Sequence, residues 1–84
     1  MSNADPVRAA LGDHIVREIL LRDAPLGSDE DLFDAGFDSM SLSRVLVFVE
    51  ERFGVVIPDG DVVIDEVATL DGLTTFVRRY LEDG

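Results

Sequence analysis

The sequence predicts an all-α protein: a four-helix bundle of three longer helices and one short helix, with a long loop after helix one. Apolar residues recur at helical spacing in three separate stretches, and Gly or Pro marks the borders between them. With 84 residues the chain is long enough for one domain. We expect residues 5–83 to form this domain, and residues 1–4 to be a disordered start or a remnant of cloning.

The first helix is expected near residues 5–22. Asp5 is a favourable N-cap, and Pro6 suits the first helical position because an N–H there would have no partner. Pro25 ends the helix, since the residue before a proline is kept out of helical angles. His14 borders the apolar stripe, and we expect it to be a partly exposed helix residue without a catalytic role. The stripe itself consists of Val7, Leu11, Ile15 and Ile19.

Residues 23–38 form the long loop. Ser28 to Asp31 resemble a capping box, so one helical turn is expected at 29–33. The loop is expected to be pinned across the bundle by three apolar anchors, Leu26, Leu32 and Phe33.

The acidic residues of this loop invite comparison with the EF-hand, whose sixth position is Gly and whose twelfth is Glu. Counted from Asp29, those positions hold Asp34 and Met40. A count from Asp59 fails in the same way. The sequence therefore predicts no specific metal site.

The second helix is expected from Ser39 to Phe53. Asp38 is a good N-cap, and Gly54 is a typical residue just past a helix end. Phe48 falls between the two faces and is expected to be half-buried. The inward stripe is Leu42, Val45, Leu46, Val49 and Phe53, and the opposite face carries Met40, Ser43, Arg44, Val47, Glu50 and Glu51.

Residues 55–64 allow two interpretations. Two β-branched triplets around Pro58-Asp59-Gly60 give a hairpin signal. An isolated two-stranded ribbon is marginally stable, however, and no other segment offers a sheet to join. We therefore favour an extended crossing followed by a short third helix somewhere in 60–67.

Thr69 is expected to cap the final helix. Its buried stripe is predicted to be Leu70, Leu73, Val77, Tyr80 and Leu81, with Phe76 at the edge. Arg78, Arg79, Glu82 and Asp83 are expected to face water.

The charge balance narrows the possible partners. Eighteen acidic residues against seven basic ones, all Arg, give a net charge of −11. Such a chain repels nucleic acids and anionic membrane surfaces, and it favours partners with basic protein surfaces. The alternative is that the charge serves solubility only. The absence of Cys, of a long apolar run and of a signal peptide favours a cytoplasmic protein.

Ser39 is the residue that the chemistry points to. With Asp38 as the cap, Ser39 is the first helical residue, and its hydroxyl faces outward at the positive end of the helix dipole, where a phosphate is favoured. Its surroundings are not Gly-x-Ser-x-Gly, and the single histidine lies on another helix. The sequence predicts no catalytic residue and no enzyme; Ser39 is interpreted as an acceptor that another enzyme modifies.

The run Gly36-Phe37-Asp38-Ser39-Met40 resembles the Asp-Ser-Leu motif of acyl carrier proteins. The resemblance extends over nearly the whole chain. It includes Leu32 before the motif, the helix end at Glu50 to Gly54, Ile57-Pro58 and the Thr69-Leu70 start of the last helix.

This resemblance implies that Ser39 carries 4′-phosphopantetheine, covalently attached from coenzyme A, with Asp38 as its motif partner. It implies a monomeric carrier that is loaded by a phosphopantetheinyl transferase and served by acyl-loading and acyl-processing enzymes with basic docking surfaces. The matching docking positions are Met40, Val47, Glu50 and Glu51. The arm would hold acyl intermediates as thioesters for fatty-acid, polyketide or related biosynthesis.

Alternatives remain open. An aminoacyl or peptidyl carrier of a nonribosomal pathway fits the same motif, and so does a carrier that folds but is never loaded. An unmodified acidic adaptor is a further candidate from another class. Three features depart from the family pattern: Met40 replaces Leu, Phe37 places a ring beside the motif, and Arg44 with Phe48 adds charge and bulk to the docking helix.

Overall fold

The computed structural model describes residues 6–27 and 29–83. Three α-helices make up the frame: α1 (Pro6–His14), α2 (Ser39–Phe53) and α3 (Leu70–Asp83). A π-helical segment, η1 (Ile15–Leu20), continues α1, and two 3₁₀ turns, η2 (Asp59–Asp61) and η3 (Ile64–Glu66), lie between α2 and α3. No strand occurs in the part of the chain that is described, and none of its helices is long and apolar enough to cross a bilayer.

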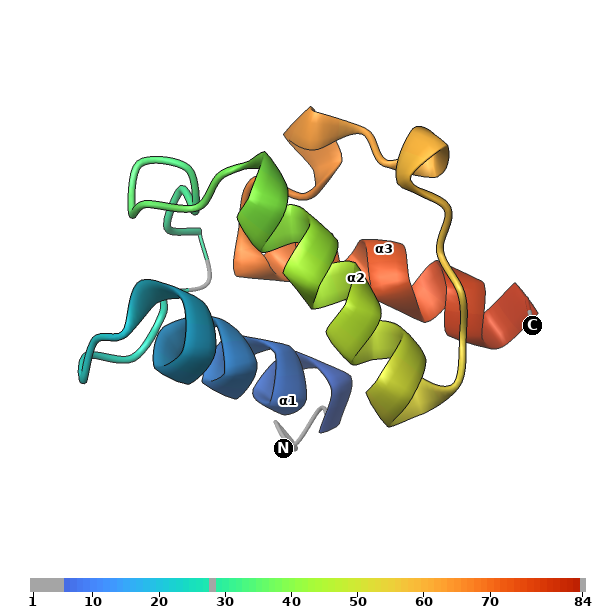
Figure 1. The fold of residues 1–84 in the computed structure, drawn as a ribbon, viewed down its shortest axis with the longest axis horizontal. Coiled ribbons are helices and arrows are strands. Elements are labelled where there is room, and N and C mark those ends of the chain that lie inside the picture. The colour runs from blue at the N-terminus through green and yellow to red at the C-terminus, as the bar shows by residue number, and fades with distance from the viewer. Residues whose placement is uncertain (1–5, 28, 84) are drawn as a thin grey trace.

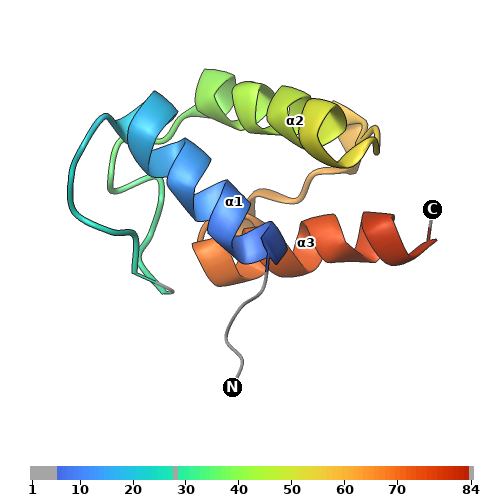
Figure 2. The ribbon, with the colours of Figure 1, turned by 90° about the horizontal axis from the view of Figure 1, so that it is seen from below.

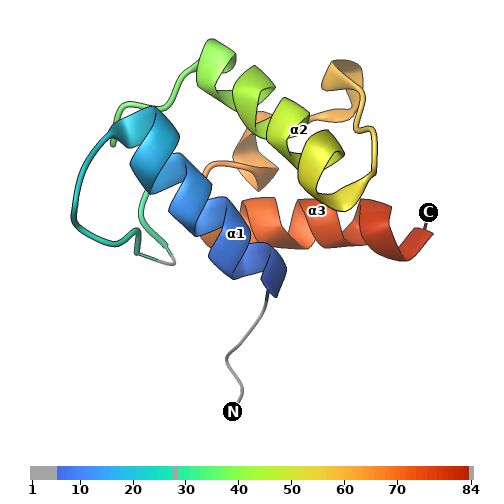
Figure 3. The same cartoon turned by 60° about the horizontal axis from the view of Figure 1, so that its bottom comes forward.

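The three helices are arranged around one core. Figure 1 shows α2 and α3 running in the same general direction and α1 running against them. Figures 2 and 3 show α1 crossing α3 near the start of α3. Arg8 pairs with Asp71 at this crossing, and Gly12 leaves room for Leu70. The most deeply buried side chains are Leu11, Ile15, Leu32, Val45, Val49, Val67, Leu73 and Val77.

The first helix departs from its predicted form in its last two turns. It was expected to be regular to about residue 22, whereas it widens to a π-helix at Ile15 and ends at Leu20. Leu21 then adopts left-handed angles (φ 54°, ψ 48°), and its N–H reaches the carbonyl of Val16. The helix therefore ends at Leu20, with Leu21 as its C-cap, before Pro25 could stop it. The predicted cap Asp5 lies outside the described residues.

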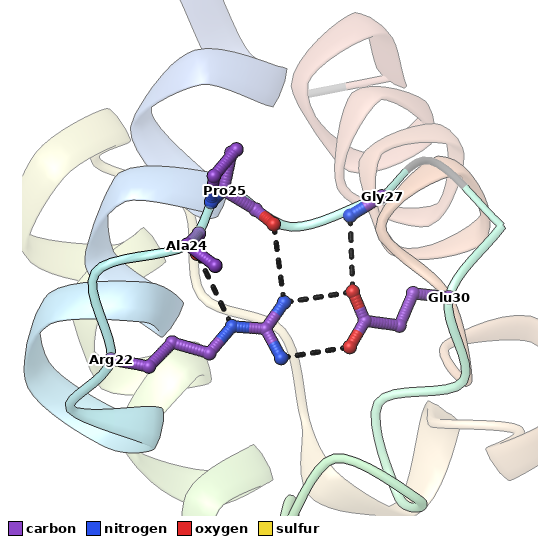
Figure 4. A network of polar contacts seen from close by, with 5 residues as sticks. All are labelled: Arg22, Ala24, Pro25, Gly27 and Glu30. Atoms are coloured by element: carbon purple, nitrogen blue, oxygen red, sulfur yellow. Dashed lines mark hydrogen bonds and ion pairs between the residues drawn. The ribbon is translucent and has the colours of Figure 1, made fainter.

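The connection between η1 and α2 is organised by polar contacts. Arg22 donates to both carboxylate oxygens of Glu30 (2.8 and 2.7 Å) and to the carbonyls of Ala24 and Pro25, as Figure 4 shows. The Arg22 guanidinium lowers the pKa of Glu30 to about 2, helped by the N–H of Gly27.

The helical turn predicted at 29–33 lies three residues further on, at 32–36. Asp31 explains the shift, because its carboxylate accepts from the N–H groups of Phe33 and Asp34. Leu32 is fully buried, and its N–H donates to the carbonyl of Ala68.

The segment after α2 contains two 3₁₀ turns in place of the predicted short helix. The N–H of Asp61 donates to Pro58 and that of Glu66 to Val63, each closing a tight turn. The β-branched residues 62–64 lie at this break, which fits their low preference for a regular helix. The hairpin alternative does not form. This segment runs back along α2 to the start of α3, as Figure 1 shows. Because α2 and α3 point in the same general direction, the connection between them has to return in this way.

The last helix begins as predicted and differs in its buried stripe. The Thr69 hydroxyl accepts from the N–H of Gly72 at 3.0 Å, which confirms the cap. Phe76, expected at the edge, is 3% exposed, whereas Tyr80 and Leu81 are only half-buried. Phe76 therefore belongs to the buried face of α3, and η3 contacts this helix.

Candidate functional site

The N-terminus of α2 is built by Asp38. This residue has extended angles (φ −139°, ψ −173°), and its Oδ1 accepts from the backbone N–H of Ser41 at 2.8 Å. The same oxygen accepts from the Ser41 hydroxyl at 2.9 Å. The N–H of Ser41, then its hydroxyl, lower the pKa of Asp38, so the cap is a carboxylate at neutral pH. Gly36, at φ 117°, allows the turn that delivers the chain to this cap.

Ser39 begins α2 and is exposed. No hydrogen bond to its hydroxyl is found among residues 6–27 and 29–83. Two further serines follow on the same helix: Ser41 is 8% exposed and bonded to Asp38, whereas Ser43 is exposed one turn along. Ser39 is therefore the hydroxyl at this helix end that is both accessible and next to the helix N-terminus.

Nothing in the described chain activates Ser39 as a nucleophile. His14 stacks on Phe48, with ring centroids 4.1 Å apart and an interplanar angle of 12°. Burial lowers the pKa of His14, and Arg44 acts in the same direction against Glu18 and Asp13. One oxygen of the Asp38 carboxylate, Oδ1, accepts both hydrogen bonds from Ser41. The arrangement suits a hydroxyl that a second protein modifies.

A small groove opens beside Ser39. It has a volume of about 150 Å³ and is lined by Ser39, Leu42, Ser43, Leu46 and Val62. Four of these residues come from α2, and Val62 comes from the link between η2 and η3. The sequence did not single out Val62 for this role, because only the return of the chain along α2 brings it there.

The outward face of α2 carries the four residues predicted as a docking surface. Met40 is 76% exposed and Val47 is 54% exposed, and Glu50 and Glu51 are also exposed. Arg44, on the same face, donates to the carbonyl of Glu18 at 3.1 Å and so ties α2 to η1. Phe48 is half-buried, as expected.

Phe37, one of the three departures from the family pattern, does not place its ring at the surface beside the motif. It is 3% exposed and packs edge-on against Phe33, with ring centroids 5.5 Å apart. The ring is thus part of the core and anchors the loop directly before Asp38. The sequence could not show whether the Phe37 side chain points into the core or toward solvent. Its burial depends on how the loop crosses the bundle.

Comparison with known proteins identifies the family. A family model described as the phosphopantetheine attachment site matches residues 13–77. A D-alanyl carrier protein of Streptococcus suis (strain 05ZYH33) is 41% identical over 46 residues, which cover 54% of this chain and 58% of that protein. A D-alanyl carrier protein of Streptococcus sanguinis (strain SK36) is 42% identical over 45 residues, covering 52% of this chain and 57% of that protein.

The chain therefore matches less than two thirds of the length of each of these relatives. The family match, in contrast, runs from the end of α1 into α3 and includes the whole of α2. Proteins of this family are carriers that work with a phosphopantetheinyl transferase and with processing enzymes, and their cofactor is covalently attached 4′-phosphopantetheine. Since well over half of its residues match, the chain belongs to the phosphopantetheine-binding carrier proteins and is not itself an enzyme.

Proposed function

We propose that Ser39 is the attachment site of 4′-phosphopantetheine and that residues 5–83 act as one carrier domain. The observation that carries this proposal is the exposed hydroxyl at the first residue of a 15-residue helix, which makes no hydrogen bond within residues 6–27 and 29–83. A phosphodiester there would be stabilised by the positive end of the α2 dipole. The exposure of Ser39 leaves space for an arm, so the residues present fit the group.

The role of the chain in this function is to present the Ser39 hydroxyl and the attached arm to other enzymes, and the chain does not itself catalyse a reaction. In the loading step, Ser39 Oγ forms a bond to the phosphorus of coenzyme A that carries the pantetheine arm. The bond from that phosphorus to the oxygen of 3′,5′-ADP breaks, and 3′,5′-ADP leaves. The hydroxyl proton passes to a base of the transferase. Asp38 holds the first turn of α2 rigid, and by likeness to the family it also helps to place the transferase. When bound, the arm supplies a terminal thiol that holds cargo as a thioester.

Two classes of cargo fit the site. One is an acyl intermediate of fatty-acid, polyketide or related biosynthesis. The other is an aminoacyl group, which is favoured by the names of the two streptococcal relatives, both D-alanyl carrier proteins. The groove beside Ser39, at about 150 Å³, also fits a small cargo better than a long chain.

The cargo class is tested by loading the holo-protein with two enzymes in parallel. One reaction contains D-alanine, ATP and the enzyme that charges a D-alanyl carrier protein, and the other contains malonyl-coenzyme A and a malonyl transferase. A mass gain of one alanyl group in the first reaction alone would support the aminoacyl candidate. A malonyl gain in the second alone would support the fatty-acid or polyketide candidate.

Partner enzymes are proposed to dock on the outward face of α2 through Met40, Val47, Glu50 and Glu51. The two carboxylates would attract Lys or Arg on the partner, and the two apolar side chains would supply contact area. A monomer fits this use, because a net charge of −11 makes copies of the chain repel one another.

The attachment itself is tested with coenzyme A, Mg²⁺ and a broad-specificity phosphopantetheinyl transferase. Intact mass should rise by one phosphopantetheine. A chain that serves as an unmodified adaptor, or a carrier that is never loaded, would keep its mass with several different transferases.

A further inference from the structure

Two adjacent residues of α3 hold the two 3₁₀ turns. The Tyr80 hydroxyl donates to Asp61 Oδ2 in η2 at 2.9 Å, and Arg79 Nη1 donates to Glu66 Oε1 in η3 at 3.4 Å. Residues 62 and 63 lie between these turns and are fixed at both ends by α3.

Val62 is the wall of the groove that faces α2. It follows Asp61 directly and lies opposite Leu42 and Leu46 in the lining of the 150 Å³ space beside Ser39. A larger occupant would have to push Val62 away from α2 and would carry Asp61 with it. A displacement of an ångström or more would break the bond from Tyr80, because hydrogen bonds weaken steeply beyond their normal length.

The next residue of this wall, Val63, is 49% exposed. Val63 lines a second hollow, of about 440 Å³, whose other lining residues include Phe76 and Tyr80. Val62 packs only partly against the core and Val63 is exposed, so the ties to α3 contribute to fixing the position of the wall. Burial and the Asp61 hydrogen bond raise the pKa of Tyr80, so its hydroxyl keeps the proton it donates at neutral pH.

We propose that Tyr80 is a positioning residue that sets the size of the acyl group admitted beside Ser39, by holding Asp61 and hence Val62 against α2. This inference rests on the proposed attachment of the arm to Ser39. A space of this volume admits a group of about benzene size, on the order of six carbons. Cargo of that length enters the groove, and a longer chain stays outside unless the tie opens.

The test loads defined cargo without any pathway enzyme. A broad-specificity transferase is supplied with butyryl- or octanoyl-coenzyme A, so that the Ser39 Oγ–phosphorus bond forms, 3′,5′-ADP leaves and the thioester stays intact. Intact mass confirms loading. Hydroxylamine is then added: its nitrogen forms a bond to the thioester carbonyl carbon, the carbon–sulfur bond breaks and the free thiol is released. The rate of thiol release reports how exposed the thioester is.

The comparison is between the wild-type chain and Tyr80→Phe, which keeps the ring and removes the hydroxyl. In the wild type, the butyryl thioester should be cleaved more slowly than the octanoyl thioester. In Tyr80→Phe, cleavage of the octanoyl thioester should slow by about two- to tenfold, the range expected when one hydrogen bond no longer opposes opening.

Three further variants separate positioning from a general loss of structure. Asp61→Asn keeps an oxygen that accepts from Tyr80 and should retain the wild-type ratio of octanoyl to butyryl cleavage, whereas Asp61→Ala should match Tyr80→Phe. Thr75→Val removes an exposed α3 hydroxyl that forms no hydrogen bond with any described residue of η2 or η3, and it should leave the ratio unchanged. Circular dichroism confirms that each variant is folded.

The possible failures are distinguishable. If mass shows full loading but Tyr80→Phe keeps the wild-type ratio, the positioning role is wrong and the carrier function stands. If Asp61→Asn behaves like Asp61→Ala, the tie does not act through the accepted hydrogen bond. If no loading occurs on the wild type, the proposed function fails first.

Discussion

The carboxylate of Asp38 holds Ser41 twice, through its backbone N–H at 2.8 Å and through its hydroxyl at 2.9 Å. Both bonds use one oxygen, Oδ1. Together they fix the first turn of α2, and the hydroxyl of Ser39, which directly follows Asp38, makes no hydrogen bond within the described residues. The cap therefore decides which of the serines at this helix end is available.

Replacing Asp38 by Ala should lower the midpoint of urea unfolding while leaving the slope unchanged, because two donors on Ser41 lose their acceptor. Asp38→Asn keeps an acceptor oxygen and should unfold near the wild-type midpoint, while the transferase modifies it more slowly. An Asn variant as destabilised as the Ala variant would contradict a cap that works through its oxygen.

Gly72 should be intolerant of a side chain. A Cβ at this position would collide with the backbone carbonyl oxygen of Glu66, so α3 and η3 could not keep their close approach. Gly72→Ala should cost about 1–3 kcal/mol of unfolding free energy, the range for overpacking. Gly60→Ala is the matched control, since a Cβ there meets nothing within 4 Å. Equal unfolding free energies for the two variants would show that the close approach is wrong.

His14 should make stability depend on pH near neutrality. Burial lowers its pKa from the usual 6.5, so the unfolded chain binds the proton more tightly than the fold does. The free energy of unfolding should therefore fall as pH decreases below about 6.5. The contribution linked to His14 is fully present above that pH. His14→Phe keeps a ring to stack on Phe48 and cannot titrate.

The measurement for His14 is urea unfolding of both chains at about pH 7.5 and about pH 5.5. The wild type should lose stability between these values and His14→Phe should lose less. Equal losses would mean that Asp13 and Glu18 compensate the burial of the ring.

The acids at the end of α2 should matter for docking. Glu50→Lys with Glu51→Lys should raise the KM of the transferase for this chain and weaken its salt dependence, because two carboxylates no longer attract a basic surface. Asp23→Lys with Asp29→Lys makes the same change of net charge on exposed residues of the loop that precedes α2, outside this face. If the two double variants behave alike, only total charge matters and α2 is not the docking helix.

Local sequence signals were sufficient to predict α2, the helix that carries the site. Asp38 and Gly54 mark both ends of α2 in the sequence, and the structure begins and ends this helix at the predicted residues. The exposed face of α2 could also be predicted from the sequence, because Met40 and Val47 lie among charged residues outside the apolar stripe. Such signals act within a few residues and so survive without knowledge of the rest of the fold.

Features set by distant contacts were not predictable in this way. The π-helical widening of η1 has no marker in its sequence, and it accompanies the contact from Arg44 to the Glu18 carbonyl. The burial of Phe37 depends on the path of the loop, and the meeting of Val62 with α2 depends on the return of residues 54–69 toward α3. The bond from Tyr80 to Asp61 joins residues 19 apart that no short pattern connects.

The measurement that tests the central claim most directly is the location of the modification among the three serines of α2. The wild type, Ser39→Ala, Ser41→Ala and Ser43→Ala are each incubated with coenzyme A, Mg²⁺ and the transferase, and intact mass and fragment masses are recorded. The account predicts one phosphopantetheine on the wild type, on Ser43→Ala and, at a reduced rate, on Ser41→Ala, and none on Ser39→Ala. A phosphopantetheine on Ser39→Ala, or an unmodified wild type, would contradict it.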